Sequence, residues 1–339
     1  MTNGALRGEM TPKTPEVWEV RRASLHDRDA LVALCTAAVG PDDYVIPLME
    51  DMTLRGVWHV GFDGDRIVGA MHFTRAIDGT GWLGAARTHP EYRRKGVARA
   101  ILQSFIGLAS RSRIPALRLW SSARNAAGSA SAKASGFREV ARFTRVRRKA
   151  ARGPERAVKL AFDADVATEV VKGPLARLAN GYVPYNWYFV PLTAANVHLL
   201  ASAGAFHRVA GGIAAFSVHP EMEREGALDV GLVAGNPAKV LRAMPAAAHA
   251  LGFKEVHSFL PHDPKVLTAA AQAGFENESW GQEAVLFERS VELGPASYRK
   301  RPTYAEIAAG KREGYAALAL LTGKHGHGHT GPHEDRWNA

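Results

Sequence analysis

Apolar and polar positions in the first 150 residues change between helical and strand-like spacing. Four apolar positions between 31 and 38 share one helical face, and Gly40-Pro41 ends that helix. Residues 57–62 and 66–74 flank Asp63-Gly64, a hairpin dipeptide, and predict two antiparallel strands. Further strands are expected at 82–88, 117–121 and 139–148, and further helices at 97–109 and from 126 to about 135. This order predicts an α/β fold with a mixed sheet.

From about residue 159 the pattern begins again. Helices are expected at 194–203, 237–251 and 264–273, and strands at 209–218, 227–234 and 254–260. Because each half closes a helix on Gly-Phe, at 136–137 and 274–275, we interpret the second half as a divergent copy of the first. The expected organisation is a flexible N-terminus (1–16), a first domain (17–149), a basic linker (150–158), a second domain (159–293), and a C-terminal helix with a His-rich tail (294–339).

Composition narrows the class of protein. The chain has 339 residues, 46% of them hydrophobic, which is typical of a globular protein with a real core. The one cysteine, Cys35, excludes an intrachain disulfide and a multi-cysteine zinc site. Residues 1–19 carry no run resembling a signal peptide, and no segment of about 18 apolar residues occurs, so we expect a cytoplasmic protein without a membrane partner. The net charge of +10 favours anionic partners.

The most informative motif lies where the strand at 82–88 gives way to the helix at 97–109. It reads Arg93-x-x-Gly96-x-Ala98. Successive backbone N–H groups at a helix N-terminus can converge on one anion, and glycine lets the backbone approach it closely. Arg93, Arg94 and Lys95 add positive charge. The motif therefore predicts a phosphate-binding turn.

The run from His89 to Ala98 resembles the acetyl-CoA loop of the GNAT superfamily of N-acetyltransferases, and Asn125 resembles the second signature of that superfamily. The resemblance covers about residues 17–149 and implies tandem GNAT-like domains, the second degenerate. It implies that acetyl-CoA is the co-substrate and that the acceptor is an amine. The residues that would hold the pyrophosphate, the pantetheine arm and their surroundings are Ala86, Arg87, Thr88, Arg93, Arg94, Lys95, Gly96, Val97, Ala98 and Asn125.

The catalytic acid and base depart from the pattern of the superfamily. Ala132 stands where the resemblance would place a tyrosine acid, and the strand at 82–88 contains no carboxylate. Tyr44 is the candidate acid and His72 the candidate base, with Asp78 as a further possibility for the base. A structural role for His72 is the simpler interpretation.

Looser similarities concern the acceptor. Residues 40–47 and 180–200 resemble parts of histidine N-acetyltransferase-like proteins, which would imply a free amino acid or a similar small molecule as acceptor. In the second half, the loop at 235–239 lacks the Arg-x-x-Gly-x-Ala pattern, and Pro237 removes an N–H. We therefore expect no CoA binding by the second domain.

Two alternatives remain at this stage. The missing acid and base would suit a non-catalytic acyl-CoA sensor or scaffold. A basic cluster between Arg142 and Lys159 would suit nucleic-acid binding, although a solvated strand edge with a linker is the simpler interpretation because no aromatic platform accompanies it. The alternating histidines between 325 and 333 are more typical of a disordered tail than of a metal site, so no metal is expected. No oligomeric state is predicted.

Overall fold

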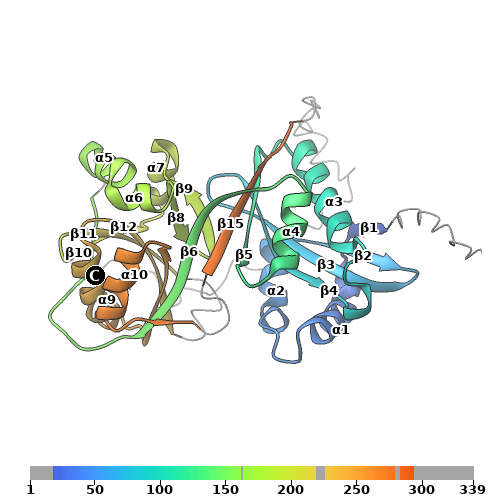
Figure 1. Ribbon diagram of the computed structural model, residues 1–339, viewed down its shortest axis with the longest axis horizontal. Helices are drawn as coiled ribbons and strands as arrows, with labels where there is room; N and C mark the ends of the chain where they lie inside the picture. The colour runs from blue at the N-terminus through green and yellow to red at the C-terminus, as the bar shows by residue number, and fades with distance from the viewer. Residues whose placement is uncertain (1–17, 162, 219–225, 279–282, 294–339) are drawn as a thin grey trace, which may run out of the picture. The chain divides into compact units, whose positions relative to one another are not determined.

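The computed structural model describes residues 18–161, 163–218, 226–278 and 283–293. Contacts divide the chain into two compact units (Figure 1). Unit 1 contains Met1–Ala141 and Ala284–Val291, and unit 2 contains Arg142–Glu283 with the residues from Glu292 onward. The expected flexible N-terminus, C-terminal helix and His-rich tail lie outside the described residues.

Unit 1 is built on a mixed sheet. Its elements are β1 (Glu19–Arg22), η1 (Leu25–Asp27), α1 (Arg28–Ala38), α2 (Val45–Arg55), β2 (Gly56–Asp63), β3 (Arg66–Arg75), β4 (Gly81–Thr88), η2 (Pro90–Tyr92), α3 (Val97–Arg111), β5 (Ala116–Ser122), α4 (Ala126–Ala134) and β15 (Glu283–Ser290). The strand order is β1-β2-β3-β4-β5-β15. Neighbouring strands are antiparallel except β4 and β5, which are parallel.

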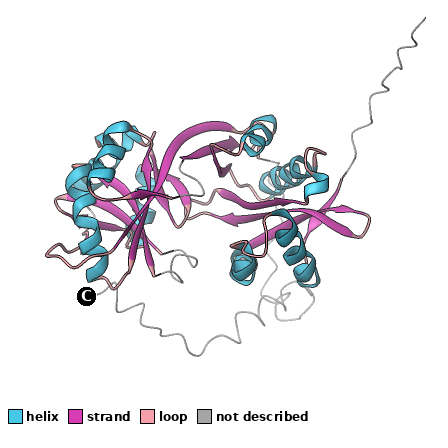
Figure 2. Ribbon diagram, turned by 60° about the horizontal axis from the view of Figure 1, so that its bottom comes forward, coloured by secondary structure: helices cyan, strands magenta, loops and turns pink. Residues whose placement is uncertain are grey.

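Both faces of the unit 1 sheet are covered by helices (Figure 2). On one face, Leu31 and Leu34 of α1 and Met49 of α2 pack with Trp58 and Val60 of β2. On the other face, α3 buries its apolar stripe against strands that include β15. The alternation of strand residues between two cores explains why these strands are apolar on both sides.

Unit 2 repeats this plan. Its elements are β7 (Val158–Lys159), α5 (Ala164–Lys172), α6 (Pro174–Leu178), β8 (Tyr182–Tyr185), β9 (Tyr188–Pro191), α7 (Ala194–Ser202), β10 (Phe206–Val209), β11 (Gly212–Ser217), β12 (Ala227–Ala234), α9 (Pro237–Ala250), β13 (Glu255–Pro261), α10 (Pro264–Gln272) and β14 (Glu276–Asn277). The order β7-β10-β11-β12-β13-β6, in which β6 is Arg138–Lys149, has the same sequence of strand directions as unit 1. The chain therefore has a mixed α/β fold with a tandem repeat of one topology.

The last strand of each sheet comes from the other half of the sequence. β6 (Arg138–Lys149) follows the unit 1 elements along the chain, yet its residues 143–149 pair with β13 in unit 2. β15 follows the unit 2 elements along the chain, yet it pairs with β5 in unit 1 over Ala116–Ser122. The two halves thus exchange their final strands.

Most of the elements expected from the sequence occur within a few residues of their predicted bounds, but some expectations were wrong. The strand expected at 209–218 occurs as β11 but begins only at Gly212, and the strand β10 before it was not predicted. Between the two strands, Ala210 and Gly211 both adopt positive φ and form a hairpin turn. Residues 45–55 form the helix α2, a segment for which no element was predicted, and Pro47 lies in its first turn. Proline is tolerated there, because the N–H groups in the first turn of a helix have no acceptor within the helix.

The interpretation of the basic cluster as a solvated strand edge was wrong in two respects, although Arg142, Arg147, Lys149, Arg152, Arg156 and Lys159 are exposed. β6 is paired along 143–149, so it is no edge on that side. Arg145 is 1% exposed and bonds Asp229 at 2.7 Å and Glu278 at 3.0 Å. Its guanidinium also lies over the ring of Trp187 at 4.7 Å. Because this charge is neutralised inside unit 2, it is not available to a nucleic acid.

Candidate active site

The sheet of unit 1 opens between its two parallel strands. β4 pairs with β5 only at Gly81 and Trp82, which face Leu117 and Arg118. Beyond Trp82, no strand of the described chain pairs with β4 on its β5 side. This leaves a row of backbone N–H and C=O groups along the end of β4, and such groups require partners. The opening can accept an extended ligand that pairs as an additional strand.

A β-bulge lies within this opening. On β3, Ala70 pairs with Arg87 and His72 pairs with Gly84, so Ala85 and Ala86 together face one residue. Ala85 has φ 50°, a left-handed conformation that is uncommon for a residue with a Cβ. A bulge takes one residue out of the ladder and redirects the local backbone. The predicted pantetheine-binding residues Ala86, Arg87 and Thr88 therefore lie on an irregular stretch of β4 with which no described strand pairs on the β5 side.

The predicted phosphate-binding turn begins where β4 ends. Arg94 and Gly96 have positive φ values of 62° and 90°. Gly96 caps the N-terminus of α3, and a Cβ added to it would have room, with Trp18 Nε1 nearest at 3.8 Å, so its conformation rather than space favours glycine. Among the hydrogen bonds of the described residues, the N–H groups of Arg94, Gly96, Val97 and Ala98 have no backbone acceptor. The turn thus offers four amides to an anion.

Neighbouring side chains hold this turn in place. Trp18 Nε1 donates to the carbonyl of Lys95 at 2.9 Å, and Lys95 Nζ lies 4.9 Å from the ring centre of Tyr92. Arg93 donates to the carbonyl of Ala38 at 2.8 Å, at the end of α1. Arg93 therefore braces the turn against α1, whereas Arg94 and Lys95 are exposed and lend it positive charge.

Asn125 follows β5 and begins α4. Its Oδ1 accepts a hydrogen bond from the N–H of Gly128 at 2.9 Å, so it caps that helix. The cap accounts for an asparagine at this position without a ligand. Its predicted part in cofactor binding remains a prediction.

A buried ion pair fixes the α1–α2 loop to β4. Arg87 donates from Nε and Nη2 to the two carboxylate oxygens of Asp43, each at 2.6 Å. The side chain of Arg87 is 11% exposed and that of Asp43 is 0% exposed. Burial opposes ionisation of Asp43, but the hydrogen bonds from Arg87 and from the N–H of Val45, together with the charge of Arg87, outweigh it and lower the pKa of the carboxyl. Burial, with the Asp43 charge nearby, raises the pKa of the Cys35 thiol to about 11, which makes Cys35 a poor nucleophile.

The same pair places Tyr44 beside β4. The guanidinium carbon of Arg87 lies 5.3 Å from the ring centre of Tyr44, which is 42% exposed. Tyr44 therefore lies beside the strand that carries the opening. The resemblance would place a tyrosine acid at position 132, but this residue is Ala132. It is 1% exposed and lies in the core on the α3 face of the sheet.

His72 lies opposite Gly84 and just before the bulge, but its environment disfavours proton uptake. The side chain is buried, and Nε2 lies 2.8 Å from the carbonyl of Met52, to which it donates. Burial lowers the pKa of His72 to about 4, so the ring is neutral at pH 7. Its predicted role as a base stays untested, with only Nδ1 left to accept a proton.

A charged cluster that was not predicted lies at the point where β4 and β5 separate. Arg118 donates to Asp78 and to Glu288, each at 2.6 Å. Glu288 lies on β15, 170 residues along the chain from Arg118, and faces it in register. Asp78, considered above as a base, is thereby engaged in an ion pair. The one signal in the sequence was an arginine between two leucines in a predicted strand, which implies a buried charge with a partner.

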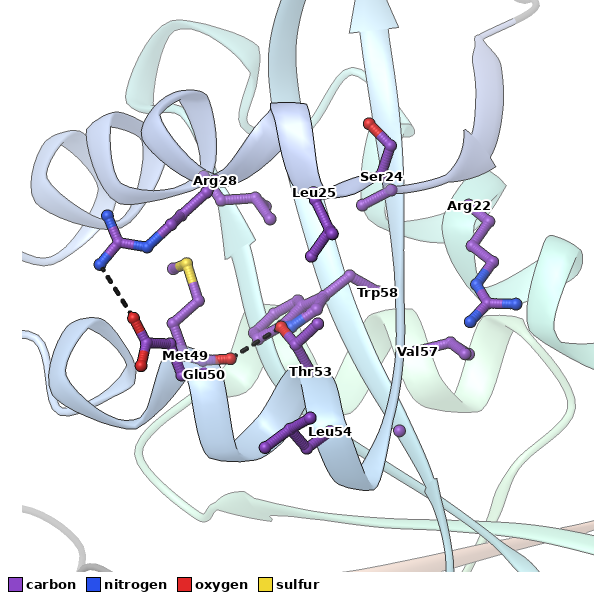
Figure 3. A pocket seen from close by; sticks show the side chains of 13 residues that line it. Arg22, Ser24, Leu25, Arg28, Met49, Glu50, Thr53, Leu54, Val57 and Trp58 are labelled. Atoms are coloured by element: carbon purple, nitrogen blue, oxygen red, sulfur yellow. Dashed lines mark hydrogen bonds and ion pairs between the residues drawn. The ribbon is translucent and has the colours of Figure 1, made fainter. Parts of the chain in front are cut away.

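A pocket of about 510 Å³ lies elsewhere in unit 1 (Figure 3). Its walls come from residues 22–31, at the end of β1, η1 and α1, and from residues 49–58, in α2 and the start of β2. We call it the η1–α2 pocket. None of the predicted site residues lines it.

Two further findings bear on function. Among residues 18–161, 163–218, 226–278 and 283–293, no cluster of three or more His, Cys, Asp or Glu residues could hold a metal ion. Within that same part of the chain, no helix is long and apolar enough to cross a membrane.

The chain is similar to known proteins in sequence and in fold. Residues 29–137 match the family model described as Acetyltransferase (GNAT) family. A proposed acetyltransferase from Thermoplasma acidophilum is 16% identical, with a TM-score of 0.53, and the match covers 80% of this chain and 99% of the other. A GCN5-related N-acetyltransferase from Sphaerobacter thermophilus is 13% identical, with a TM-score of 0.52, and covers 83% and 98%. No curated protein sequence matches the chain.

These similarities extend over both units, but at such low identity they show the fold alone. They give no support to the expected closer resemblance to histidine N-acetyltransferase-like proteins. The matched segment contains the opening of β4, the turn at 93–98 and Asn125. Residues 29–137 thus resemble an acetyltransferase domain of the GNAT family, and the chain has the fold of the solved acetyltransferases to which it is similar.

Proposed function

We propose that the protein is an N-acetyltransferase that transfers the acetyl group of acetyl-CoA to the amine of a small molecule, such as a free amino acid. The observation that carries this proposal is the continuity of the open edge of β4 with the turn at 93–98. An anionic group and an extended amide-bearing arm need those two features side by side, and the chain supplies them within about 15 residues.

The residues present fit acetyl-CoA, which would supply an activated thioester. The amides of Arg94, Gly96, Val97 and Ala98 would bind its pyrophosphate, with Arg94 and Lys95 adding charge. The backbone of Ala86, Arg87 and Thr88 would pair with its pantetheine arm. An N–H at the bulge of Ala85 and Ala86 would stabilise negative charge on the reacting carbonyl oxygen.

The acceptor amine must lose a proton to attack the thioester directly in a ternary complex. His72 is the candidate to receive it at Nδ1, either directly or through water. Tyr44 is the candidate acid for the leaving thiolate, because the Arg87–Asp43 pair holds it next to β4.

The test has two readouts, acetyl-CoA affinity and release of free thiol across a panel of amino acids and small amines. Gly96→Trp should abolish acetyl-CoA binding, because a side chain at φ 90° strains the turn and occupies the space beside its amides. Gly79→Trp is the matched control, since Gly79 also has positive φ (77°) and open space around it but lies in the β3–β4 turn. Equal acetyl-CoA affinity in the two variants would refute the assignment of the turn.

A non-catalytic acyl-CoA sensor is the second candidate. It is favoured by Ala132, by the neutral His72 and by the absence of a carboxylate from Gly81–Thr88 of β4. It predicts that acetyl-CoA protects the fold from heat and that no acceptor releases thiol. One acceptor with sustained turnover would exclude it.

A further inference from the structure

The η1–α2 pocket combines an apolar interior with an exposed apolar rim. Leu31, Met49 and Trp58 in its walls are buried, and each is at most 3% exposed. Leu25 and Leu54 at its rim are 83% and 79% exposed, the two highest values among the exposed large hydrophobic residues of the described chain. Its volume of about 510 Å³ falls within the range of small-molecule sites, roughly 300–1,000 Å³.

The pocket wall contains an unsatisfied hydrogen-bond donor. The Trp58 side chain is buried, yet its Nε1–H has no acceptor among the residues that the structure describes. Two hydroxyls also line the pocket, but both use their protons internally: Ser24 donates to Asp27 at 2.9 Å and Thr53 to the carbonyl of Met49 at 2.7 Å. A buried donor without a partner is costly, so an acceptor brought by a ligand would be favoured there.

Charge at the pocket favours an uncharged ligand. Arg28 and Glu50 lie across the rim from each other, and their side chains approach to 3.6 Å (Figure 3). Each neutralises the other. Arg22 also lines the pocket, from β1, and lies apart from Arg28 and Glu50 in Figure 3. An ionised ligand held against the buried Leu31, Met49 and Trp58 would lose its hydration, which is unfavourable.

The pocket is distinct from the candidate active site. Trp58 on β2 pairs with His72 on β3, and His72 pairs with Gly84 on β4. Two strand spacings, about 10 Å, separate the backbone of the pocket wall from that of the β4 opening. The Trp58 and His72 rings, with centres 4.9 Å apart, fill the space between them on this face of the sheet.

We propose that the η1–α2 pocket is a binding site for an uncharged, mainly apolar small molecule with a carbonyl-type oxygen, and that this oxygen accepts a hydrogen bond from Trp58 Nε1. Because Nε1 is closed off from solvent, a ligand must displace a neighbouring side chain to reach it. The site goes beyond the acetyl-transfer function and does not depend on it.

Three probes of similar size separate the components of this proposal. Acetophenone has the apolar ring and the acceptor, ethylbenzene lacks the acceptor, and benzoate adds a negative charge. Binding is followed in the full chain through the indole N–H resonance of Trp58 in ¹⁵N-labelled protein. We expect acetophenone to shift this resonance saturably, ethylbenzene to bind about 3- to 10-fold more weakly, and benzoate to bind more weakly still.

Two variants complete the test. Trp58→Phe keeps a ring but removes the donor, so acetophenone and ethylbenzene should bind it equally, as measured by thermal shift. Leu54→Ser changes an exposed rim residue and should weaken both probes while preserving the preference for acetophenone, which tests the site even if Trp58→Phe does not fold. Absence of saturable binding by acetophenone would overturn the proposal. Equal binding of ethylbenzene to the native protein, or tighter binding of benzoate, would overturn the assigned chemistry.

Discussion

The Arg87–Asp43 pair offers the sharpest test of how the α1–α2 loop is held against β4. Replacing Arg87 with Met removes the cation and leaves Asp43, whose side chain is 0% exposed, as an isolated buried carboxyl. Breaking a buried pair in this way costs about 3–5 kcal/mol in the free energy of unfolding. Replacing both residues, as Arg87→Met with Asp43→Leu, should cost much less, because no uncompensated charge remains.

The assay is urea-induced unfolding of the four proteins of this double-mutant cycle, followed by tryptophan fluorescence at pH 7. The coupling energy should exceed about 2 kcal/mol, within the range found for residues in one buried network. The effect should also depend on pH in a defined direction. Arg87 lowers the pKa of Asp43, so its contribution to stability is present above the unfolded pKa, near 4, and is lost as the pH falls through the folded value.

The difference between the native protein and Arg87→Met should therefore shrink below about pH 4. Additive effects, with a coupling energy under about 0.5 kcal/mol, would refute the reasoning. The stability of Arg87→Lys should lie between those of the native protein and of Arg87→Met, because lysine keeps the charge but cannot donate the two parallel hydrogen bonds. The same variants should also lower acetyl-transfer activity if Tyr44 depends on this pair for its position.

Three other predictions rest on buried groups. Arg145→Met should destabilise unit 2 by about 3–5 kcal/mol in urea unfolding, since it leaves Asp229 and Glu278 without their cation; a loss under about 1 kcal/mol would contradict the assigned ion pairs. Alkylation of Cys35 by iodoacetamide at pH 8 should be far slower in the native protein than in urea, because its thiol pKa is raised to about 11; equal rates would show that the thiol is accessible and ionised. Burial lowers the pKa of His59 and His72 to about 4, so protons bind the unfolded state before the folded state as the pH falls. Lowering the pH from 7 to 5 should therefore reduce the free energy of unfolding by about 2 kcal/mol for each histidine. A His59→Gln, His72→Gln double variant that keeps the native pH dependence would exclude this explanation.

Local signals predicted the parts of the fold that local interactions determine. The hairpin at Asp63-Gly64 and the turn at 93–98 were expected from their glycines. In the structure Gly64 and Gly96 adopt positive φ, a conformation that glycine favours. The strand predicted at 209–218 began too early, because Ala210 adopts positive φ in the turn before β11, and alanine is not a residue type that indicates such a turn. No element was predicted over 45–55, where α2 forms.

The candidate site was predictable only where it is contiguous in sequence. The turn and the end of β4 follow one another along the chain, so their residue types could be interpreted together. The partners of Arg87, Arg118 and Arg145 could not, because tertiary pairing over 44 to 170 residues decides them. A buried arginine in a strand indicates that a carboxylate lies nearby, but the sequence around it does not identify which carboxylate.

The exchange of final strands has a consequence for any attempt to dissect this chain. A fragment that stops at Lys149 would retain β6 but lack the segment that borders β5, exposing Ala116–Ser122 as an unprotected edge. During synthesis the first sheet would wait for residues 284–290 to leave the ribosome before its border strand could dock. Each half of the chain therefore needs a strand from the other half. An isolated N-terminal fragment should aggregate or pair with another copy of itself.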